Sequence, residues 1–166
     1  MNGLLVGRFQ PFHLGHLEAL RFALSQVESL WVGLGSSNRP INADNPFSAD
    51  ERRQMITSSI NNLTSRRISI YAVPDTDSHE KWIKKLDDIV PEFGTVFSND
   101  DLTGHLYSGR SVRVVPIPFL QRNDLSGTNI RNLIRTGGKW EDLVPEGTKN
   151  FLIKTGAKRR LKDLYK

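Results

Sequence analysis

The chain has 166 residues, of which 37% are hydrophobic and 25% charged, and its formal net charge at pH 7 is +5. A chain of this length is expected to form one domain over residues 1–166 around a single core. It contains no cysteine, which excludes disulfides, a thiolate nucleophile and a cysteine-ligated zinc site. The positive charge indicates an anionic partner, either a polyphosphate nucleotide or a nucleic acid.

The amino terminus carries no basic stretch followed by a long apolar run. The sequence therefore predicts neither a signal peptide nor a membrane span, and we expect a cytoplasmic protein with no membrane partner. Much of the positive charge falls in residues 157–166, which we expect to form a solvated terminal helix.

Short runs of apolar and β-branched residues recur along the chain. They cover residues 3–6, 30–34, 68–73, 95–98 and 112–117, and most of the intervals between them have helical character. Strands that alternate with helices are typical of α/β proteins, in which helices cover both faces of a parallel sheet. We therefore predict a Rossmann-like, doubly wound sheet of five parallel strands. Short helices are expected to follow as a C-terminal helical extension over about residues 139–166.

The first strand leads directly into a turn that carries two histidines. Gly7 lets the chain leave the sheet closely packed, and Pro11 and Gly15 bracket the entry to a helix. His13 and His16 lie three residues apart and can share one face of the first helical turn. Free backbone N–H groups and the helix dipole favour an anion at this place, so the segment predicts a nucleotide phosphate site.

Two further helices have recognisable starts. Ser48, with Glu51 three residues later, forms a capping box and predicts a helix that runs to Ile60. A third helix is expected over residues 78–89, where Pro91 stops it.

A second anion cradle is predicted after the fifth strand, beyond a loop over residues 118–124. Ser126, Gly127 and Thr128 offer two hydroxyls and backbone N–H groups at a helix start, and the spacing returns Arg131 to the same face. In doubly wound sheets, ligands bind outside the carboxyl ends of the strands, where the strand order reverses. We therefore expect the first and the last of these turns to face one crevice.

Three segments also resemble a known family. Residues 7–16, Gly-Arg-Phe-Gln-Pro-Phe-His-Leu-Gly-His, are similar to the His-x-Gly-His signature of the nucleotidylyltransferases, and in extended form to archaeal-type nicotinamide mononucleotide adenylyltransferases. Residues 126–131 resemble the carboxyl-terminal signature of the superfamily, although Leu125 replaces a tyrosine of the archaeal branch. Residues 45–52 resemble a third segment, in which Asp50 replaces a glycine. Members of this family join the 5′-phosphate of a mononucleotide to the α-phosphorus of ATP and release pyrophosphate.

The resemblance implies roles for particular residues. The catalytic group would be His13, His16, Arg8 and Arg131. The contacts with ATP and its phosphates would come from Gly7, Arg8, Phe9, His13, Gly15, His16, Ser126, Gly127, Thr128 and Arg131. Arg39 is a further candidate, because Asp44 stands where some relatives have a phosphate-binding arginine. Mg²⁺ held mainly by ATP phosphates and water would complete the charge balance without a dedicated protein metal site.

The resemblance also places a site for the nicotinamide ring at Trp82, Asp75 and His79. An indole can stack on this flat cationic ring, and a polar side chain can fix its carboxamide. Trp82 has a rival role as a core residue of its own helix. His79 replaces an asparagine that is common in the family, and residues 99–101 differ from its usual Gly-Asn-Pro.

Three functional hypotheses follow. The leading one is transfer of AMP from ATP to nicotinamide mononucleotide by direct in-line attack of the mononucleotide 5′-phosphate, giving NAD and pyrophosphate; acceptance of nicotinate mononucleotide stays open. It implies no nucleic acid partner, and a homo-oligomer such as the hexamers of the archaeal branch. The second hypothesis keeps the phosphate site and changes the acceptor to FMN, phosphopantetheine or a small alcohol phosphate. The third is a nucleic-acid-binding domain that uses the basic tail and Arg52, Arg53, Arg66 and Arg67.

Overall fold

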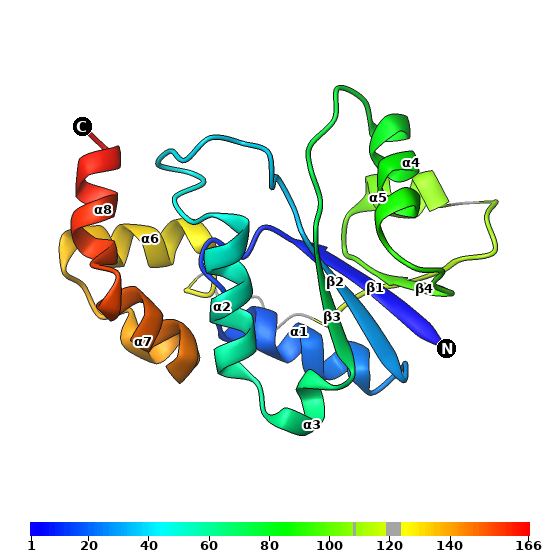
Figure 1. Ribbon diagram of the computed structural model, residues 1–166, viewed down its shortest axis with the longest axis horizontal. Coiled ribbons are helices and arrows are strands. Elements are labelled where there is room, and N and C mark those ends of the chain that lie inside the picture. The colour runs from blue at the N-terminus through cyan, green and yellow to red at the C-terminus, as the bar shows by residue number, and fades with distance from the viewer. Residues whose placement is uncertain (108, 119–123) are drawn as a thin grey trace. The chain divides into compact units, whose positions relative to one another are not determined.

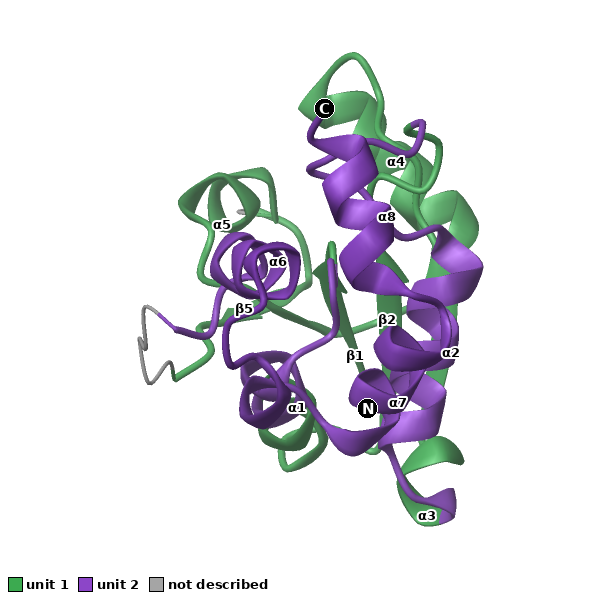
Figure 2. Cartoon of the chain, turned by 90° about the vertical axis from the view of Figure 1, so that its left-hand side faces the viewer, with its two compact units in different colours: residues 1–8, 19–39, 63–118 green, residues 9–18, 40–62, 119–166 purple. Residues whose placement is uncertain are grey.

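The computed structural model describes residues 1–107, 109–118 and 124–166, and its chain divides into two compact units (Figure 2). Unit 1 comprises Met1–Arg8, Ala19–Arg39 and Leu63–Pro118, and unit 2 comprises Phe9–Glu18, Pro40–Asn62 and Phe119–Lys166. The expected single domain over residues 1–166 stays a prediction. Most of the loop expected over residues 118–124 lies outside the described residues.

Unit 1 contains a five-stranded parallel sheet (Figure 1). Its strands are β1 (Asn2–Gly7), β2 (Ser29–Leu34), β3 (Ile68–Ala72), β4 (Thr95–Phe97) and β5 (Arg113–Val115), in the order β3-β2-β1-β4-β5. The five strands predicted from the sequence are confirmed, with ends that shift by a residue or two. Because the chain builds outward from β1 to β3 and then returns to place β4 on the other side of β1, the strand order reverses between β1 and β4. A ligand crevice is therefore expected at the carboxyl ends of these two central strands.

Helices cover both faces of this sheet, as predicted. On one face, Leu4 of β1 and Val96 of β4 belong to a buried apolar cluster with residues of α4 (His79–Ile89) and α5 (Asp101–Tyr107). On the other face, the ring of Phe97 packs edge-on against Phe22 of α1 (Leu14–Leu24), with ring centroids 6.1 Å apart. These two layers fix the central strands whose ends carry the first motif.

Helix α1 differs slightly from the prediction. It begins at Leu14, so Gly15 lies inside its first turn rather than before it, and it ends at Leu24. The end is stabilised by Arg67, whose side chain donates hydrogen bonds to the carbonyl oxygens of Leu24, Val27 and Glu28 at 2.7, 2.8 and 2.9 Å. Carbonyl groups at a helix end have no partner within the helix, and a cationic donor is well suited to them.

Unit 2 is helical. It contains the first turn of α1, then α2 (Ala49–Ser59), α6 (Gly127–Thr136), the short 3₁₀ helix η1 (Glu141–Leu143), α7 (Glu146–Lys154) and α8 (Ala157–Leu164), while the short helix α3 (Asn62–Ser65) falls at the division between the units. The predicted capping box is confirmed, because Ser48 Oγ accepts from the N–H of Glu51 and Glu51 Oε1 accepts from the N–H of Ser48, both at 3.1 Å. The hydroxyls of Ser78 and Ser126 cap α4 and α6 by accepting from the N–H groups of Lys81 and Asn129.

The expected terminal helix is present as α8 and most of its charged side chains are exposed, but one face of it is buried. Ala157 and Leu161, one turn apart on α8, are 2% and 0% exposed. Arg160 donates from both terminal nitrogens to the carboxylate of Glu51 at 2.8 and 2.9 Å, and also to the carbonyl oxygen of Pro46 at 3.1 Å. Burial alone would raise the pKa of Glu51, but the bonds from Arg160 and the Ser48 N–H outweigh it and lower that pKa. Arg160 therefore anchors the terminal helix to the cap of α2, whereas Lys158, Arg159 and Lys162 are exposed.

Candidate functional site

The two predicted anion cradles meet within unit 2. Arg131 of α6, which is 7% exposed, donates from Nη1 to the carbonyl oxygen of Gln10 at 2.8 Å and from Nη2 to Thr128 Oγ1 at 3.4 Å. A Cβ added at Gly127 would lie 2.7 Å from Arg131 Nη1 and 3.1 Å from the Gln10 oxygen, so a larger residue there would force this guanidinium to shift. The first and the last motifs are thus in contact, while the crevice that both were expected to face stays a prediction.

The two histidines cap the start of α1 and stack on each other. The Nδ1 atom of His13 accepts from the N–H of Gly15, and the Nδ1 atom of His16 accepts from the N–H of His13, both at 3.1 Å. Their rings are stacked with centroids 3.6 Å apart, and Phe9 packs edge-on to His16 at 4.7 Å. A neutral imidazole that accepts at Nδ1 carries its proton on Nε2. Each histidine is therefore left with an Nε2–H that can donate to a phosphate oxygen.

The surroundings keep both imidazoles neutral. Burial lowers the pKa of His13 to about 4, and the side chain is 4% exposed. Burial also lowers the pKa of His16 well below its ordinary value, and the neighbouring His13 lowers it further. At neutral pH the pair therefore offers two uncharged donors.

The depressed pKa of His13 predicts acid sensitivity. The unfolded chain takes up the proton near pH 6.5 and the folded chain only near pH 4, so the free energy of unfolding should fall as the pH falls between these values, by about 3 kcal/mol in total. Urea unfolding at pH 7 and pH 5, without nucleotide or phosphate, should show about 2 kcal/mol of this loss. His13→Asn is the matched control, because asparagine can still cap the helix but does not titrate. An equal loss in the wild type and this variant would contradict the assignment.

A buried glutamine holds the loop that carries the first motif. Gln10, which is 3% exposed, donates from Nε2 to Asn45 Oδ1 at 2.6 Å and to the Phe47 carbonyl at 2.9 Å, and its Oε1 accepts from the Phe47 N–H at 3.0 Å. The Asn-Pro-Phe segment at residues 45–47 therefore fixes the peptide whose carbonyl Arg131 contacts. Sequence reasoning singled out this segment by resemblance but gave Gln10 no role.

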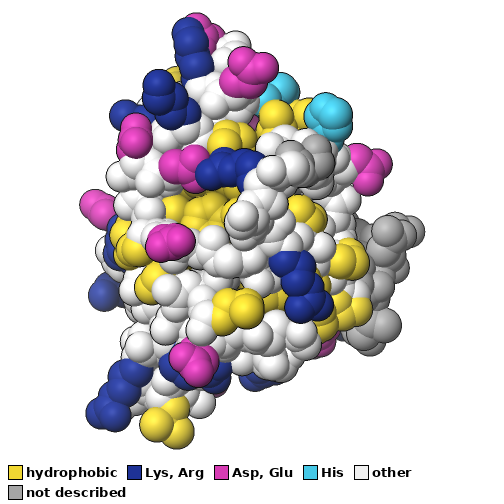
Figure 3. Space-filling model, turned by 90° about the vertical axis from the view of Figure 1, so that its right-hand side faces the viewer, with side chains coloured by type: hydrophobic (Ala, Val, Ile, Leu, Met, Phe, Trp, Pro, Cys, Tyr) yellow, Lys and Arg dark blue, Asp and Glu magenta, His cyan; other side chains and the backbone are white. Residues whose placement is uncertain are grey.

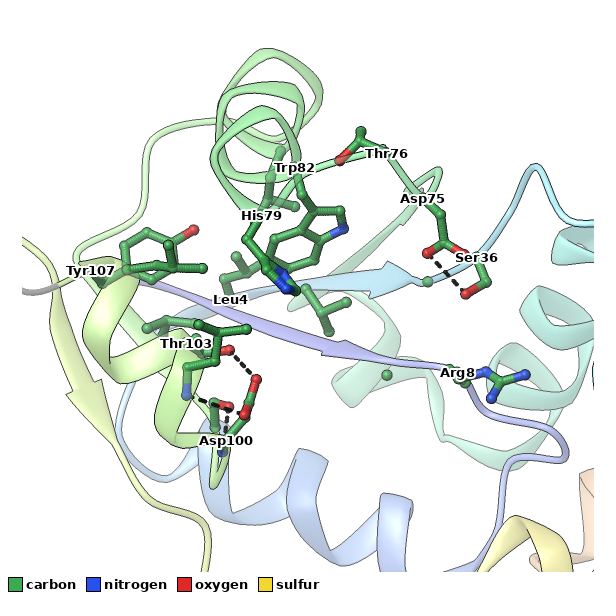
Figure 4. Close-up of a pocket in the computed structure, with 18 of the residues that line it drawn as sticks. Leu4, Arg8, Ser36, Asp75, Thr76, His79, Trp82, Asp100, Thr103 and Tyr107 are labelled. Carbon is green, nitrogen blue, oxygen red and sulfur yellow. Dashed lines mark hydrogen bonds between the residues drawn. The ribbon is translucent and has the colours of Figure 1, made fainter.

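Unit 1 contains a cavity of about 550 Å³ at the carboxyl ends of β1 and β4 (Figure 4). Six of the residues predicted for the site line it, namely Gly7, Arg8, Arg39, Asp75, His79 and Trp82. Trp82 and His79 project from α4 into the cavity, and Arg8 lies at the tip of β1. Trp82 also packs against the apolar cluster, so both of the roles considered for it are compatible with its position.

Arg39 and Asp75 are engaged with each other at the edge of this cavity. The Arg39 Nε atom forms an ion pair with Asp75 Oδ2, and Ser36 Oγ donates to Asp75 Oδ1 at 3.0 Å. If Arg39 binds phosphates or Asp75 binds the nicotinamide ring, as proposed, that side chain must either leave this ion pair or contact the ligand while it keeps the pair. Ser36 was not foreseen, because serine in a glycine-rich loop gives no signal of a partner 39 residues away.

The candidate residues therefore fall into two groups. Phe9, His13, Gly15, His16, Ser126, Gly127, Thr128 and Arg131 belong to unit 2, and Gly7, Arg8, Arg39, Asp75, His79 and Trp82 belong to unit 1. The chain passes from one group to the other between Arg8 and Phe9. In residues 1–107, 109–118 and 124–166, no group of three or more histidine or carboxylate side chains is arranged to hold a metal ion.

At least two of the four arginines proposed for a nucleic-acid surface form hydrogen bonds within the protein. Arg52 is 1% exposed and donates from Nε to the carbonyl oxygen of Ser48, while Arg67 stabilises the end of α1. On the face drawn in Figure 3, Lys and Arg side chains are interspersed with Asp and Glu. This arrangement does not favour a continuous basic patch. Among the described helices, none is long and apolar enough to cross a membrane.

A parallel sheet with this strand order is typical of α/β proteins that bind nucleotides. The chain belongs to the cytidylyltransferase-like family, whose model matches residues 4–133. It is 34% identical over 165 residues to the nicotinamide-nucleotide adenylyltransferase of Pyrococcus abyssi, covering 99% of this chain and 89% of the relative. It is 37% identical over 148 residues to the enzyme of the same name from Methanococcus maripaludis, covering 88% of this chain and 85% of the relative. The resemblance inferred from the motifs is thereby confirmed.

Solved structures share the fold. A bifunctional NMN adenylyltransferase/ADP ribose pyrophosphatase from Francisella tularensis, complexed with AMP and a manganese ion, has a TM-score of 0.81 at 22% identity. The match covers 98% of this chain but 51% of that longer one. A nicotinic acid mononucleotide adenylyltransferase from Plasmodium falciparum has a TM-score of 0.65 at 15% identity and covers 98% of this chain and 97% of that one.

Proposed function

We propose that the protein is an adenylyltransferase that makes NAD and pyrophosphate from ATP and nicotinamide mononucleotide. The observation that carries the proposal is the contact of Arg131 with the Gln10 carbonyl at 2.8 Å, which joins both phosphate motifs beside two neutral histidines. Relatives with this named activity are similar over nearly the whole chain. We propose that the protein binds both nucleotides and acts in NAD biosynthesis in the cytoplasm, as the names of these relatives suggest for the activity.

The chemistry needs alignment more than a base. The 5′-phosphate of the mononucleotide is already anionic, and its oxygen attacks the α-phosphorus of ATP in line as the bond to the β-phosphate oxygen breaks. The Nε2–H groups of His13 and His16 donate to the α- and β-phosphate oxygens, where charge develops. Arg131 holds the polyphosphate, and Ser126 and Thr128 contribute hydroxyls beside it. The role of Arg8 as a further phosphate contact stays a prediction.

Mg²⁺ is the metal we propose. The Nδ1 atoms of both histidines already accept backbone hydrogen bonds, and the described residues form no cluster of carboxylates that could hold a metal ion. The ion would therefore be held mainly by ATP phosphates and water. When bound, it would neutralise charge on the leaving pyrophosphate. Assembly into a homo-oligomer, such as a hexamer, stays a prediction.

An acceptor panel tests the function. The purified protein is incubated with ATP, Mg²⁺ and nicotinamide mononucleotide, FMN, phosphopantetheine or glycerol phosphate, and pyrophosphate release is followed. We expect turnover with nicotinamide mononucleotide. Trp82→Leu should raise the KM for this acceptor about tenfold because the stacking surface is lost, while the KM for ATP stays unchanged. Trp140→Leu, a tryptophan outside the cavity, serves as the control. Turnover with another acceptor and no dependence on Trp82 would replace the proposed acceptor.

A further inference from the structure

The cavity in unit 1 is charged unevenly. Its two arginines, Arg8 and Arg39, lie at the end of β1 and in the loop after β2. The part walled by α4 and α5 contains Trp82, apolar side chains and the hydroxyls of Thr103 and Tyr107, and none of its described lining residues is a lysine or an arginine. Figure 4 shows Arg8 and Tyr107 at opposite ends of the cavity, with Trp82 and His79 between them.

One carboxylate in this part has no cationic partner among the described residues. Asp77 is paired with Lys81, whose Nζ lies 3.0 Å from Asp77 Oδ1. Asp100 instead accepts from the N–H of Leu102 at 3.2 Å and from the hydroxyl of Thr103 at 3.0 Å. Figure 4 shows its side chain directed toward the cavity from the loop before α5. Its negative charge is therefore hydrogen-bonded but not neutralised.

The two mononucleotide acceptors differ in charge at the base. The nicotinamide ring of a mononucleotide is a pyridinium cation with a neutral carboxamide, whereas the nicotinate ring adds a carboxylate directly to that cation. A nearby carboxylate of the protein attracts the cationic nicotinamide ring. It repels the carboxylate that the nicotinate ring carries. Because Asp100 is exposed, solvent screening keeps this effect to a few-fold.

We propose that Asp100 makes this cavity selective for the amidated, cationic base over its acid form. The inference rests on the proposed function and adds the residue that sets acceptor preference. Asp100 also stabilises the start of α5, so a purely structural role has to be separated from selectivity by experiment.

Asp100→Asn is the variant that separates these roles. Asparagine keeps an acceptor oxygen for the Leu102 N–H and the Thr103 hydroxyl and is an equally good cap, but it carries no charge. We would measure kcat/KM for nicotinamide and nicotinate mononucleotides at about pH 8, so that charged imidazole groups do not contribute to the preference. Equilibrium dialysis would give the dissociation constants of both mononucleotides. Asp77→Asn, which removes a carboxylate already paired with Lys81, is the matched control.

The wild type should prefer the nicotinamide form by about fivefold or more, and Asp100→Asn should reduce this ratio about three- to fivefold, chiefly by improving the acid form. Asp77→Asn should leave the ratio unchanged. A ratio unaffected by Asp100→Asn, or a wild-type preference for the acid, would overturn the inference. Absence of turnover with both acceptors would overturn the proposed function instead, and the dissociation constants would still decide the question of charge selectivity.

Discussion

Replacing His16 by alanine is expected to lower kcat for NAD formation by about 10²–10³-fold, the usual cost of removing one preorganised donor from a developing charge. The Nδ1 atom of His16 accepts from the N–H of His13, so the ring can donate to a phosphate oxygen through its Nε2–H. Ground-state ATP would keep its contacts with Arg131 and the backbone. The dissociation constant for ATP should therefore change by less than about threefold.

Steady-state pyrophosphate release and calorimetric titration with ATP give the two quantities. His105→Ala, an exposed histidine that does not line the cavity, is the control and should behave like the wild type. A thermal unfolding curve checks that loss of the His16 ring, which packs against Phe9, leaves the fold intact. Equal losses in kcat and in ATP affinity would assign His16 to binding alone.

Replacing Arg131 by lysine should lower kcat/KM for ATP by about 10²–10³-fold although the positive charge is kept. A lysine ammonium cannot hold the Gln10 carbonyl and still present a planar pair of donors to the phosphates. Gly127→Ala tests position without removing the guanidinium, because the added Cβ would lie 2.7 Å from Arg131 Nη1. It should produce an intermediate loss.

Arg135→Lys, one turn further along α6, is the control for the Arg131 variant. Arg135 lies over the ring of Tyr165 at 4.3 Å and has no proposed contact with nucleotide. Full activity in Arg131→Lys would show that charge alone suffices and would refute the role given to the guanidinium. Loss of activity in both variants would point to a general disturbance of α6 and α8.

The parts of the structure that depend on local sequence were predictable. The five strands follow from short apolar runs, and the capping box at Ser48 and Glu51 follows from two residues three positions apart. The meeting of the two phosphate motifs followed from their position after strands of one parallel sheet. Pattern and topology therefore sufficed to predict that the two motifs come together, but not that Gln10 supplies the carbonyl oxygen that Arg131 contacts.

Features set by distant partners were not predictable. The bond between Arg160 and Glu51 joins residues 109 positions apart, so the sequence of the basic tail gave no sign that Arg160 would contact the α2 cap. The spacing of His13 and His16 predicted a shared face but not which nitrogen each ring would use, because ring orientation depends on backbone N–H groups and on packing by Phe9. The sequence also did not show that Asp100, in the loop before α5, would line the cavity.

The most direct test of the account is to follow an isotope through the reaction. Nicotinamide mononucleotide labelled with ¹⁸O in its 5′-phosphate would be incubated with ATP, Mg²⁺ and the purified protein, and both products analysed by mass. Attack by that phosphate on the α-phosphorus predicts NAD that retains the whole label and an equal amount of unlabelled pyrophosphate. Absence of NAD, or label in the pyrophosphate, would contradict the proposed reaction.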